Sequence, residues 1–158
     1  MKLSVTSLLF AVLAVSAADA RIGESQEQCI ARYGRPIEKV NPGKMVIFMK
    51  EEFGIGVEFH HGKADKLVFV KMSGKIGGRF SIPMNDKEVM MLLAANGGGR
   101  KWNKLGGNVS RTLWMSNDAQ MMADRNSVTG ELVISTKAYM EREIAGVEVD
   151  EAKKLKGF

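Results

Sequence analysis

Residues 44–72 read KMVIFMKEEFGIGVEFHHGKADKLVFVKM, and three segments of this stretch have the composition of β-strands. The segments are 44–50, 54–60 and 66–72, and the last two alternate between apolar and other side chains. Short polar, glycine-containing pieces lie between them, which is typical of hairpin connections. The stretch therefore predicts an antiparallel meander of two or three strands, with one apolar face and one face exposed to solvent.

A short helix is predicted before this meander, from residue 26 to residue 33. Ser25 and Gln28 have the spacing of a capping box, in which each side chain binds a backbone amide at the start of a helix. Gly34 and Pro36 are typical of a helix end, because glycine adopts the left-handed conformation and proline prevents continuation.

A second helix is predicted over residues 86–95, because Asn85 and Glu88 repeat the capping-box spacing and Asn-Gly-Gly-Gly follows at 96–99. Further strands are predicted at 111–115, 120–125 and 132–135, although 120–125 could also be helical. A last helix is expected over residues 137–144.

The predicted order is helix, strands, helix, strands, helix, which indicates a single α+β domain over residues 21–146. We expect an antiparallel sheet of two meanders of about three strands each, covered on one face by two or three short helices. The repeated order of a helix followed by strands suggests a structural duplication, but the sequence shows no residue-level repeat. Residues 147–158 form a charged tail, which we expect to be disordered.

Residues 1–20 have the three parts of a secretory signal peptide. Lys2 is followed by the apolar run 8–15, and the small residues Ala18 and Ala20 mark a cleavage site after Ala20. We therefore expect an exported protein, periplasmic or secreted. No later segment is long and apolar enough to predict a transmembrane span.

Removal of Lys2 and Asp19 leaves the formal net charge at +5, the value of the full chain. This balance favours anionic partners such as envelope polymers, lipid headgroups or acidic proteins. The cations are scattered along the sequence, and nucleic acid is not an expected partner. Cys29 is the single cysteine, so no internal disulfide can form. We predict a buried thiol there, with a disulfide between chains as the alternative.

The segment 22–36, IGESQEQCIARYGRP, resembles the opening helix of the small outer-membrane assembly lipoproteins and their β-lactamase-inhibitor-like relatives. Its matching positions are Gly23, Ser25, Gln28, Gly34 and Pro36. The chain departs from that family in having no lipobox cysteine and only one short helix before the strands. The resemblance implies an exported α+β protein that binds other proteins.

No catalytic or metal-binding motif is indicated by local sequence. His60 and His61 are the two histidines, and as neighbours in a strand they would point to opposite faces. Glu51, Glu52 and Asp118 lie in predicted turns, and no spacing brings them together for acid–base chemistry. We expect all five side chains to be exposed, although a site assembled from dispersed residues remains open.

Ten of the eleven methionines follow the predicted cleavage site, including Met45, Met49 and Met72 in the predicted strands. Thioethers fill irregular gaps in a core, and we expect that role for these three residues. Two alternatives are an adaptable binding surface and a site for cuprous copper.

Two glycine-rich segments, 74–79 and 97–101, contain cations and could form anion-binding loops. The alternative is that they are mobile linkers. The candidate residues for contact with an anion or a partner are Arg79, Arg100, Lys101, Trp102 and Lys104.

The sequence thus favours a small, exported, non-enzymatic domain that binds a protein or an anionic envelope component, through the sheet face or a basic loop. No cofactor is predicted. The alternatives are a small envelope hydrolase and a subunit that oligomerises through sheet edges.

Overall fold

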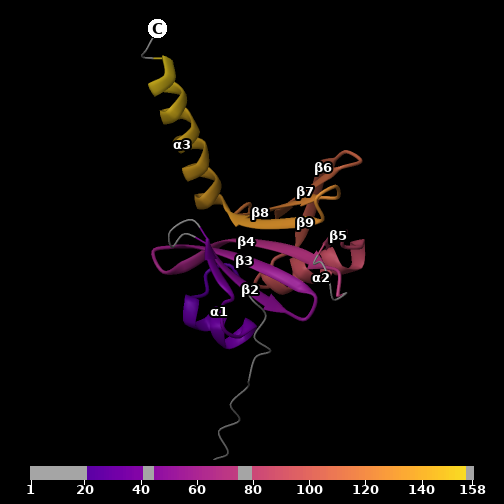
Figure 1. The fold of residues 1–158 in the computed structure, drawn as a ribbon. Helices are drawn as coiled ribbons and strands as arrows, with labels where there is room; N and C mark the ends of the chain where they lie inside the picture. The colour runs from indigo at the N-terminus through magenta and orange to yellow at the C-terminus, as the bar shows by residue number, and fades with distance from the viewer. Residues whose placement is uncertain (1–20, 41–44, 75–79, 156–158) are drawn as a thin grey trace, which may run out of the picture.

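The computed structural model describes residues 21–40, 45–74 and 80–155. Within these ranges the chain forms nine antiparallel strands and three helices, an α+β fold (Figure 1). The helices are α1 (Gln26–Tyr33), α2 (Asp86–Asn96) and α3 (Lys137–Leu155). The strands are β1 (Glu38–Val40), β2 (Met45–Lys50), β3 (Phe53–His60), β4 (Lys63–Met72), β5 (Ser81–Ile82), β6 (Trp102–Gly107), β7 (Arg111–Ser116), β8 (Met121–Asn126) and β9 (Glu131–Thr136). The predicted signal peptide, its cleavage site after Ala20, and Arg79 lie outside the described residues.

All described strands belong to one sheet, with the order β1-β2-β3-β4-β9-β8-β7-β6 and with β5 paired to β4. The central pair is β4 with β9, where Phe69 lies opposite Leu132. Strand pairing therefore joins two runs of the sequence that are about sixty residues apart in the chain. The prediction of about three strands in each run is too low, because β1 and β6 each add an edge strand.

Both predicted helix starts are confirmed by their hydrogen bonds. The Ser25 hydroxyl accepts from the Gln28 amide at 3.3 Å, and the Gln28 side chain accepts from the Ser25 amide at 2.8 Å. Asn85 and Glu88 exchange the same pair of bonds at 2.9 and 2.8 Å. These contacts satisfy amides that the first turn of a helix leaves free.

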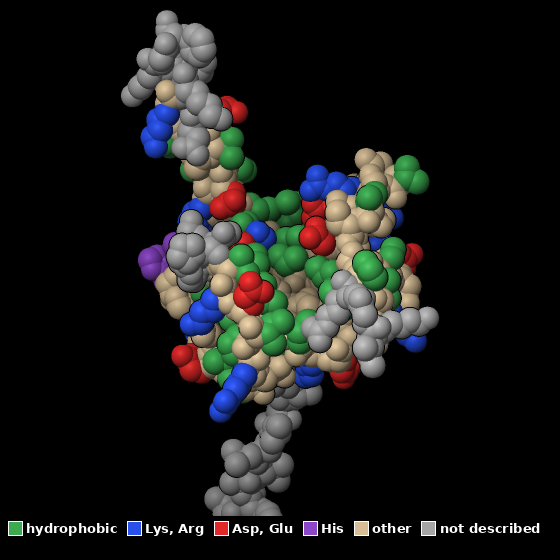
Figure 2. Space-filling view, viewed as in Figure 1, with side chains coloured by type: hydrophobic (Ala, Val, Ile, Leu, Met, Phe, Trp, Pro, Cys, Tyr) green, Lys and Arg blue, Asp and Glu red, His purple; other side chains and the backbone are tan. Residues whose placement is uncertain are grey.

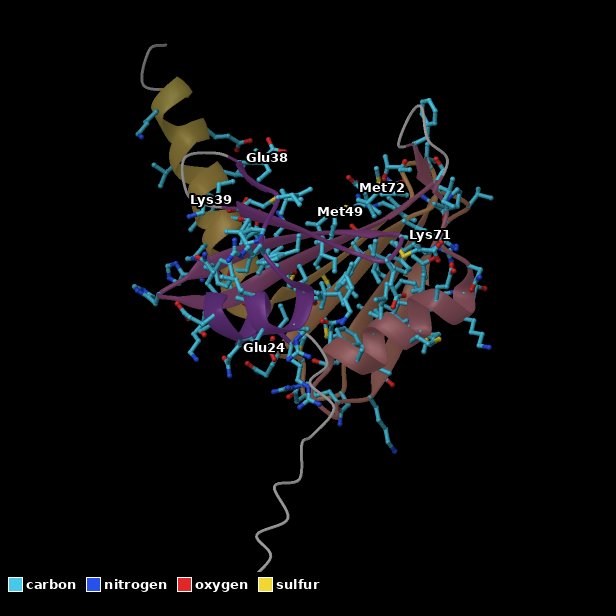
Figure 3. The ribbon with its side chains drawn as sticks, turned by 60° about the horizontal axis from the view of Figure 1, so that its bottom comes forward. Glu24, Glu38, Lys39, Met49, Lys71 and Met72 are labelled. Atoms are coloured by element: carbon cyan, nitrogen blue, oxygen red, sulfur yellow. The ribbon has the colours of Figure 1, made fainter. Side chains whose placement is uncertain are left out.

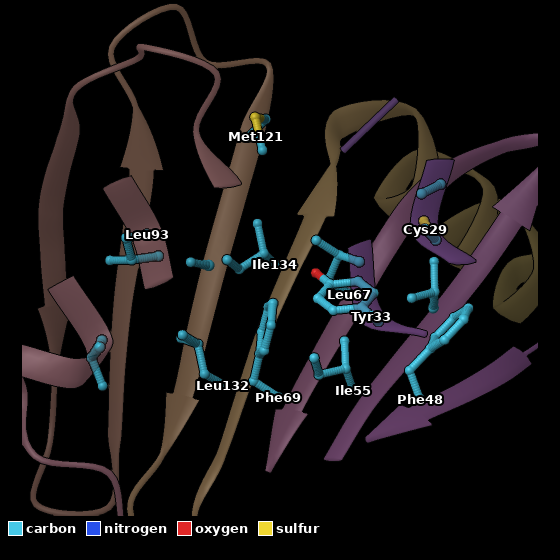
Figure 4. Close-up of a cluster of buried hydrophobic side chains, with 14 of the residues drawn as sticks. Cys29, Tyr33, Phe48, Ile55, Leu67, Phe69, Leu93, Met121, Leu132 and Ile134 are labelled. Carbon is cyan, nitrogen blue, oxygen red and sulfur yellow. The ribbon is translucent and has the colours of Figure 1, made fainter. Parts of the chain in front are cut away.

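The hydrophobic core lies between α1 and α2 and one face of the sheet (Figure 4). Cys29 and Tyr33 of α1 and Leu93 of α2 share this core with Phe48 and Phe69 of the strands. Tyr33 and Phe48 pack with ring centroids 5.5 Å apart. Full burial of one such side chain contributes about 1.5–3 kcal/mol, so this layer is the main source of stability. The predicted burial of Cys29 is confirmed, since its exposure is 0%.

The last helix is longer than the sequence predicted. α3 continues without a break to Leu155, through residues that were expected to form a disordered tail. Alanine, glutamate and lysine dominate its last turns, and these residues have high intrinsic helix propensity. In Figure 1 the helix projects away from the sheet, so its far end is stabilised by local propensity rather than by packing.

Residues 102–107 were not predicted to be a strand, yet they form β6. The segment WNKLGG contains two glycines and no alternation, and it pairs only with β7 at the edge of the sheet. Five of its six residues are exposed, so its sequence carries no alternating pattern of buried side chains. Residues 121–126 form strand β8, and the helical alternative for this segment is wrong.

Candidate functional site: the open face of the sheet

One face of the sheet, here called the open face, points away from α1 and α2. It is apolar over β2 and β4, whereas on β7, β8 and β9 polar side chains such as Asp124 and Arg111 lie among the apolar ones. On these five strands the register gives its apolar side chains as Met45, Ile47 and Met49 of β2, Val68, Val70 and Met72 of β4, Val133 of β9, Met122 of β8, and Leu113 and Met115 of β7. Figure 3 shows Met49 and Met72 on the side of the sheet opposite the two helices. All ten side chains are half-buried.

This finding corrects two predictions. The face opposite the core was expected to be exposed and polar, but over β2 and β4 it is apolar. Met45, Met49 and Met72 were expected to fill the core, but they lie on the open face. The reason is visible in the segments MVIFM and LVFV, which are continuous apolar runs rather than alternating ones. Such runs place apolar side chains on both faces of a strand.

A groove runs along the open face over β3. It has a volume of about 290 Å³ and lies between the apolar side chains of β2 and those of β4. Gly54 and Gly56 form its floor because they have no side chains where β3 faces this side. A Cβ atom on Gly56 would lie 3.0 Å from the Met45 sulfur, and one on Gly54 would lie 3.6 Å from the Met49 sulfur. The methionine sulfurs therefore lie close against the glycine floor.

Charged side chains surround this apolar surface. The register places Glu38 of β1 and Glu131 of β9 on the open face. Figure 2 shows hydrophobic side chains gathered in a hollow in the middle of the molecule, with acidic side chains beside it. Glu58 is neutralised by Lys66, whose Nζ lies 2.7 Å from the carboxylate. Glu38 and Glu131 give the margin an acidic character, because no cation pairs with either carboxylate among the described residues.

The base of α3 is fixed at one end of the open face. Lys66 Nζ donates to the Tyr139 hydroxyl at 2.9 Å and lies 4.9 Å from the ring centroid. Burial disfavours the Lys66 charge, but hydrogen bonds to Glu58 and Tyr139 outweigh it and raise the pKa of Lys66. Arg142 donates to Asp65, which is 8% exposed. These contacts tie only the first turns of α3 to the sheet.

The predicted basic loop does not gather its cations at one point. Arg100 pairs with Asp118 at 2.6 Å, and that carboxyl group has its pKa lowered to about 2 by hydrogen bonds from Ser116 and then Arg100. Lys101 and Lys104 are exposed, and Lys104 lies in β6 rather than in a loop. Arg79 lies outside the described part of the chain.

Trp102 is also in strand β6, and it has a structural role. Its indole nitrogen donates to the Leu93 carbonyl at the end of α2, at 2.7 Å. A Cβ on Gly97 would lie 2.8 Å from this nitrogen, so glycine at that position lets the indole approach the helix. Gly97 thus allows Trp102 to connect the end of α2 to the edge strand β6.

The two histidines are exposed, as predicted, at the end of β3 and in the turn that follows. The expectation that they point to opposite faces is wrong. His61 has φ of 48°, and the turn brings the two rings to a centroid distance of 4.0 Å. The described residues contain no group of three His, Cys, Asp or Glu side chains that could hold a metal ion.

The candidate carboxylates lie in different turns. Glu51 and Glu52 connect β2 to β3, where Glu52 lies 3.4 Å from Lys71, whereas Asp118 lies in the turn between β7 and β8. Strands β4 and β9 separate the two turns in the sheet order. The structure does not bring these three carboxylates together.

The residues that sequence reasoning missed are Gly54 and Gly56. Their signal was present, because two glycines at spacing two inside a strand leave one face of that strand without side chains. The fold and the site together define an α+β protein with one uncovered apolar sheet face.

Known proteins offer no match to this chain, whether among family models, curated sequences or solved structures. None of the helices in the described residues is long and apolar enough to cross a membrane.

Proposed function

We propose that this chain is an exported, non-enzymatic binding module that holds an apolar segment of another protein on its open sheet face. One observation carries the proposal. Strands β2 and β4 have apolar side chains on both faces, a pattern typical of strands that are covered on both sides. Helices α1 and α2 cover one face, and the partner covers the other.

The surface suits a protein better than an anionic polymer. Glu38 and Glu131 give the groove an acidic margin, which repels polyanions and favours lysine or arginine beside the apolar segment. The exposed cations Lys101 and Lys104 lie on and beside β6, at the far edge of the sheet from the groove. Five methionines on the open face provide flexible, polarisable contacts that adapt to different side chains.

The glycine floor sets the spacing of the groups that fit. Positions two apart in a strand are about 6.8 Å apart. This spacing matches side chains i and i+2 of an extended segment, and is close to the rise of about 6 Å between i and i+4 of a helix. A partner with two aliphatic side chains at either spacing would place one over Gly54 and one over Gly56.

The proposal includes export by the predicted signal peptide, with cleavage after Ala20, to a periplasmic or extracellular location. It also interprets the sheet as two meanders, each preceded by a helix, that join through β4 and β9. This arrangement and the N-terminal resemblance are both consistent with the protein-binding role of the outer-membrane assembly lipoproteins.

The proposal is tested by site-specific photo-crosslinking in the cells that produce the protein. A photoreactive residue replaces Ile47 on the open face or, as a control, Met91, which is 61% exposed on α2. We expect a discrete adduct with a protein from position 47 and none from position 91. Gly56→Val, which fills the groove floor, should abolish the adduct. An adduct from both positions, or one that Gly56→Val leaves unchanged, would contradict the proposal.

A further inference from the structure

A second cavity lies on the other side of the sheet, between α1 and α2. It has a volume of about 170 Å³, and its walls include Tyr33, Phe53, Phe69 and Leu92. Lys50, the last residue of β2, and Glu51, in the turn that follows, also line this cavity. Engineered apolar cavities of about 150 Å³ are known to bind benzene. The cavity between α1 and α2 is therefore large enough for one small ring.

Two buried polar side chains also line this cavity, and each has one atom without a hydrogen-bond partner among the described residues. Arg32 has 7% of its side chain exposed and donates through Nε and Nη2 to Glu24, whereas Nη1 has no acceptor. Asn96 is 2% exposed, and its Oδ1 receives no donor. A buried polar atom left in this state costs about 1–3 kcal/mol.

The other hydrogen bond of Asn96 shows which atom of its amide has no partner. Its Nδ2 donates to the Leu92 carbonyl at 2.7 Å. If the amide were flipped, its oxygen would face this carbonyl, and neither oxygen could donate a hydrogen bond. The two atoms without partners are therefore a donor on Arg32 and an acceptor on Asn96. A ligand that satisfies both must offer one acceptor and one donor.

The charges around the cavity favour a neutral ligand. Glu24 compensates the charge of Arg32, and Lys50 and Glu51 have opposite signs. A carboxylate offers acceptors but no donor to Asn96, and a hydrocarbon offers neither. An amide group offers both an acceptor oxygen and an N–H donor.

We propose that the cavity between α1 and α2 binds a small neutral molecule with an apolar ring or branched body and an amide group. The apolar body lies against Phe53, Phe69 and Leu92, the amide oxygen accepts from Arg32, and the amide N–H donates to Asn96. Solvent does not reach either polar atom in this structure, so the proposal requires both side chains to turn toward the ligand on binding. This site is independent of the open face.

The test uses NMR titration of the 21–158 chain with benzamide, benzoate and toluene. We expect saturable shifts with benzamide, at residues of α1, α2 and β3, and binding at least about tenfold weaker for the other two probes, since one tenfold step equals about 1.4 kcal/mol. Ala95 of α2 also lines the cavity, so Ala95→Leu fills it and should abolish benzamide binding. Ala94→Leu is the matched control, because Ala94 is exposed on the same helix.

Three results would overturn the proposal. They are the absence of benzamide binding, equal binding of toluene, and benzamide binding that survives Ala95→Leu. Should Ala95→Leu not fold, intermolecular NOEs from benzamide to Phe53 and Leu92 decide the question in the unmodified chain, and their absence counts against the site.

Discussion

Cys29 illustrates, at the scale of the single residue, how position in the core controls reactivity. Its side chain is 0% exposed, and burial, aided by the nearby Glu24 carboxylate, raises the pKa of the thiol to about 11. The thiolate is the reactive form, and very little of it exists at neutral pH. We therefore expect a disulfide reagent to modify the folded protein far more slowly than the unfolded protein. The absorbance of the thiol that the reagent releases, followed in buffer and in denaturant, measures both rates.

Rapid modification of the folded chain would contradict the burial of Cys29. So would a dimer that runs as one band on a non-reducing gel and disappears on reduction. Disulfides form in the compartments to which we propose the chain is exported, so this comparison checks the packing of α1.

Asp118 predicts a specific dependence of stability on pH. Hydrogen bonds from Ser116, then Arg100, lower its pKa to about 2 in the folded state, below its ordinary value of 3.8. A carboxyl group whose pKa is lowered in the folded state stabilises the fold at pH values above its ordinary pKa. This stabilisation is lost as the pH falls through the pKa of the folded state. Asp118→Asn should therefore destabilise the protein at pH 6, and the difference should shrink between pH 4 and pH 2. Denaturant unfolding at each pH measures it, and a constant difference would contradict the assignment.

At the scale of the element, α3 has a fixed base and an unsupported far end. Tyr139 and Arg142 contact the sheet, whereas every described side chain from position 143 onward is exposed. A chain that stops after Glu143 should lose helical circular dichroism but keep its unfolding free energy within about 0.5 kcal/mol, as exposed changes usually do. Arg142→Ala is the contrasting variant, because it leaves Asp65 without its partner and should cost at least about 1 kcal/mol. Equal effects of the two changes would be inconsistent with this division of α3.

The elements also show which parts of the fold were predictable from sequence. The starts of α1 and α2 were predictable because Ser25–Gln28 and Asn85–Glu88 form local hydrogen bonds. Strand β6 was not, because an edge strand is held by its neighbour rather than by its own pattern. The length of α3 was also missed, since charged composition was interpreted as disorder although its residues have high helix propensity.

At the scale of the whole molecule, the sequence predicted one apolar face of the sheet and the structure has two. The second was missed because a continuous run such as MVIFM was interpreted as a half-exposed strand. The groove depends on Gly54 and Gly56, and their spacing of two residues within a strand was a signal in the sequence that was missed. Arg100 and Trp102, in contrast, could be found in the sequence as candidates, but their partners, Asp118 for Arg100 and the Leu93 carbonyl for Trp102, could not, because both contacts depend on the fold.

Two surfaces of different character follow from this architecture. The cavity between α1 and α2 is small and has the polar side chains of Arg32 and Asn96 in its wall. The open face is broad and rich in methionine, and Glu38 and Glu131 lie at its margin. Our two proposals place a small molecule in the first and a protein partner on the second. Variants at Ala95 and Gly56 separate the two, since neither side chain lies in the other site.

The most direct test of the open face as a docking surface is the dissociation constant of the partner captured from position 47. It is measured with the 21–158 chain, with Gly56→Val and with Gly74→Val as the matched control, because a Cβ on Gly74 meets nothing within 4 Å. Valine suits the strand position 56, where the Met45 side chain can move aside, and position 74 has open space for it. Both variants should therefore unfold at the same denaturant concentration as the original chain. We expect Gly56→Val to weaken binding at least about tenfold, or by about 1.4 kcal/mol, and Gly74→Val to leave it unchanged. Equal dissociation constants for all three proteins would contradict this expectation.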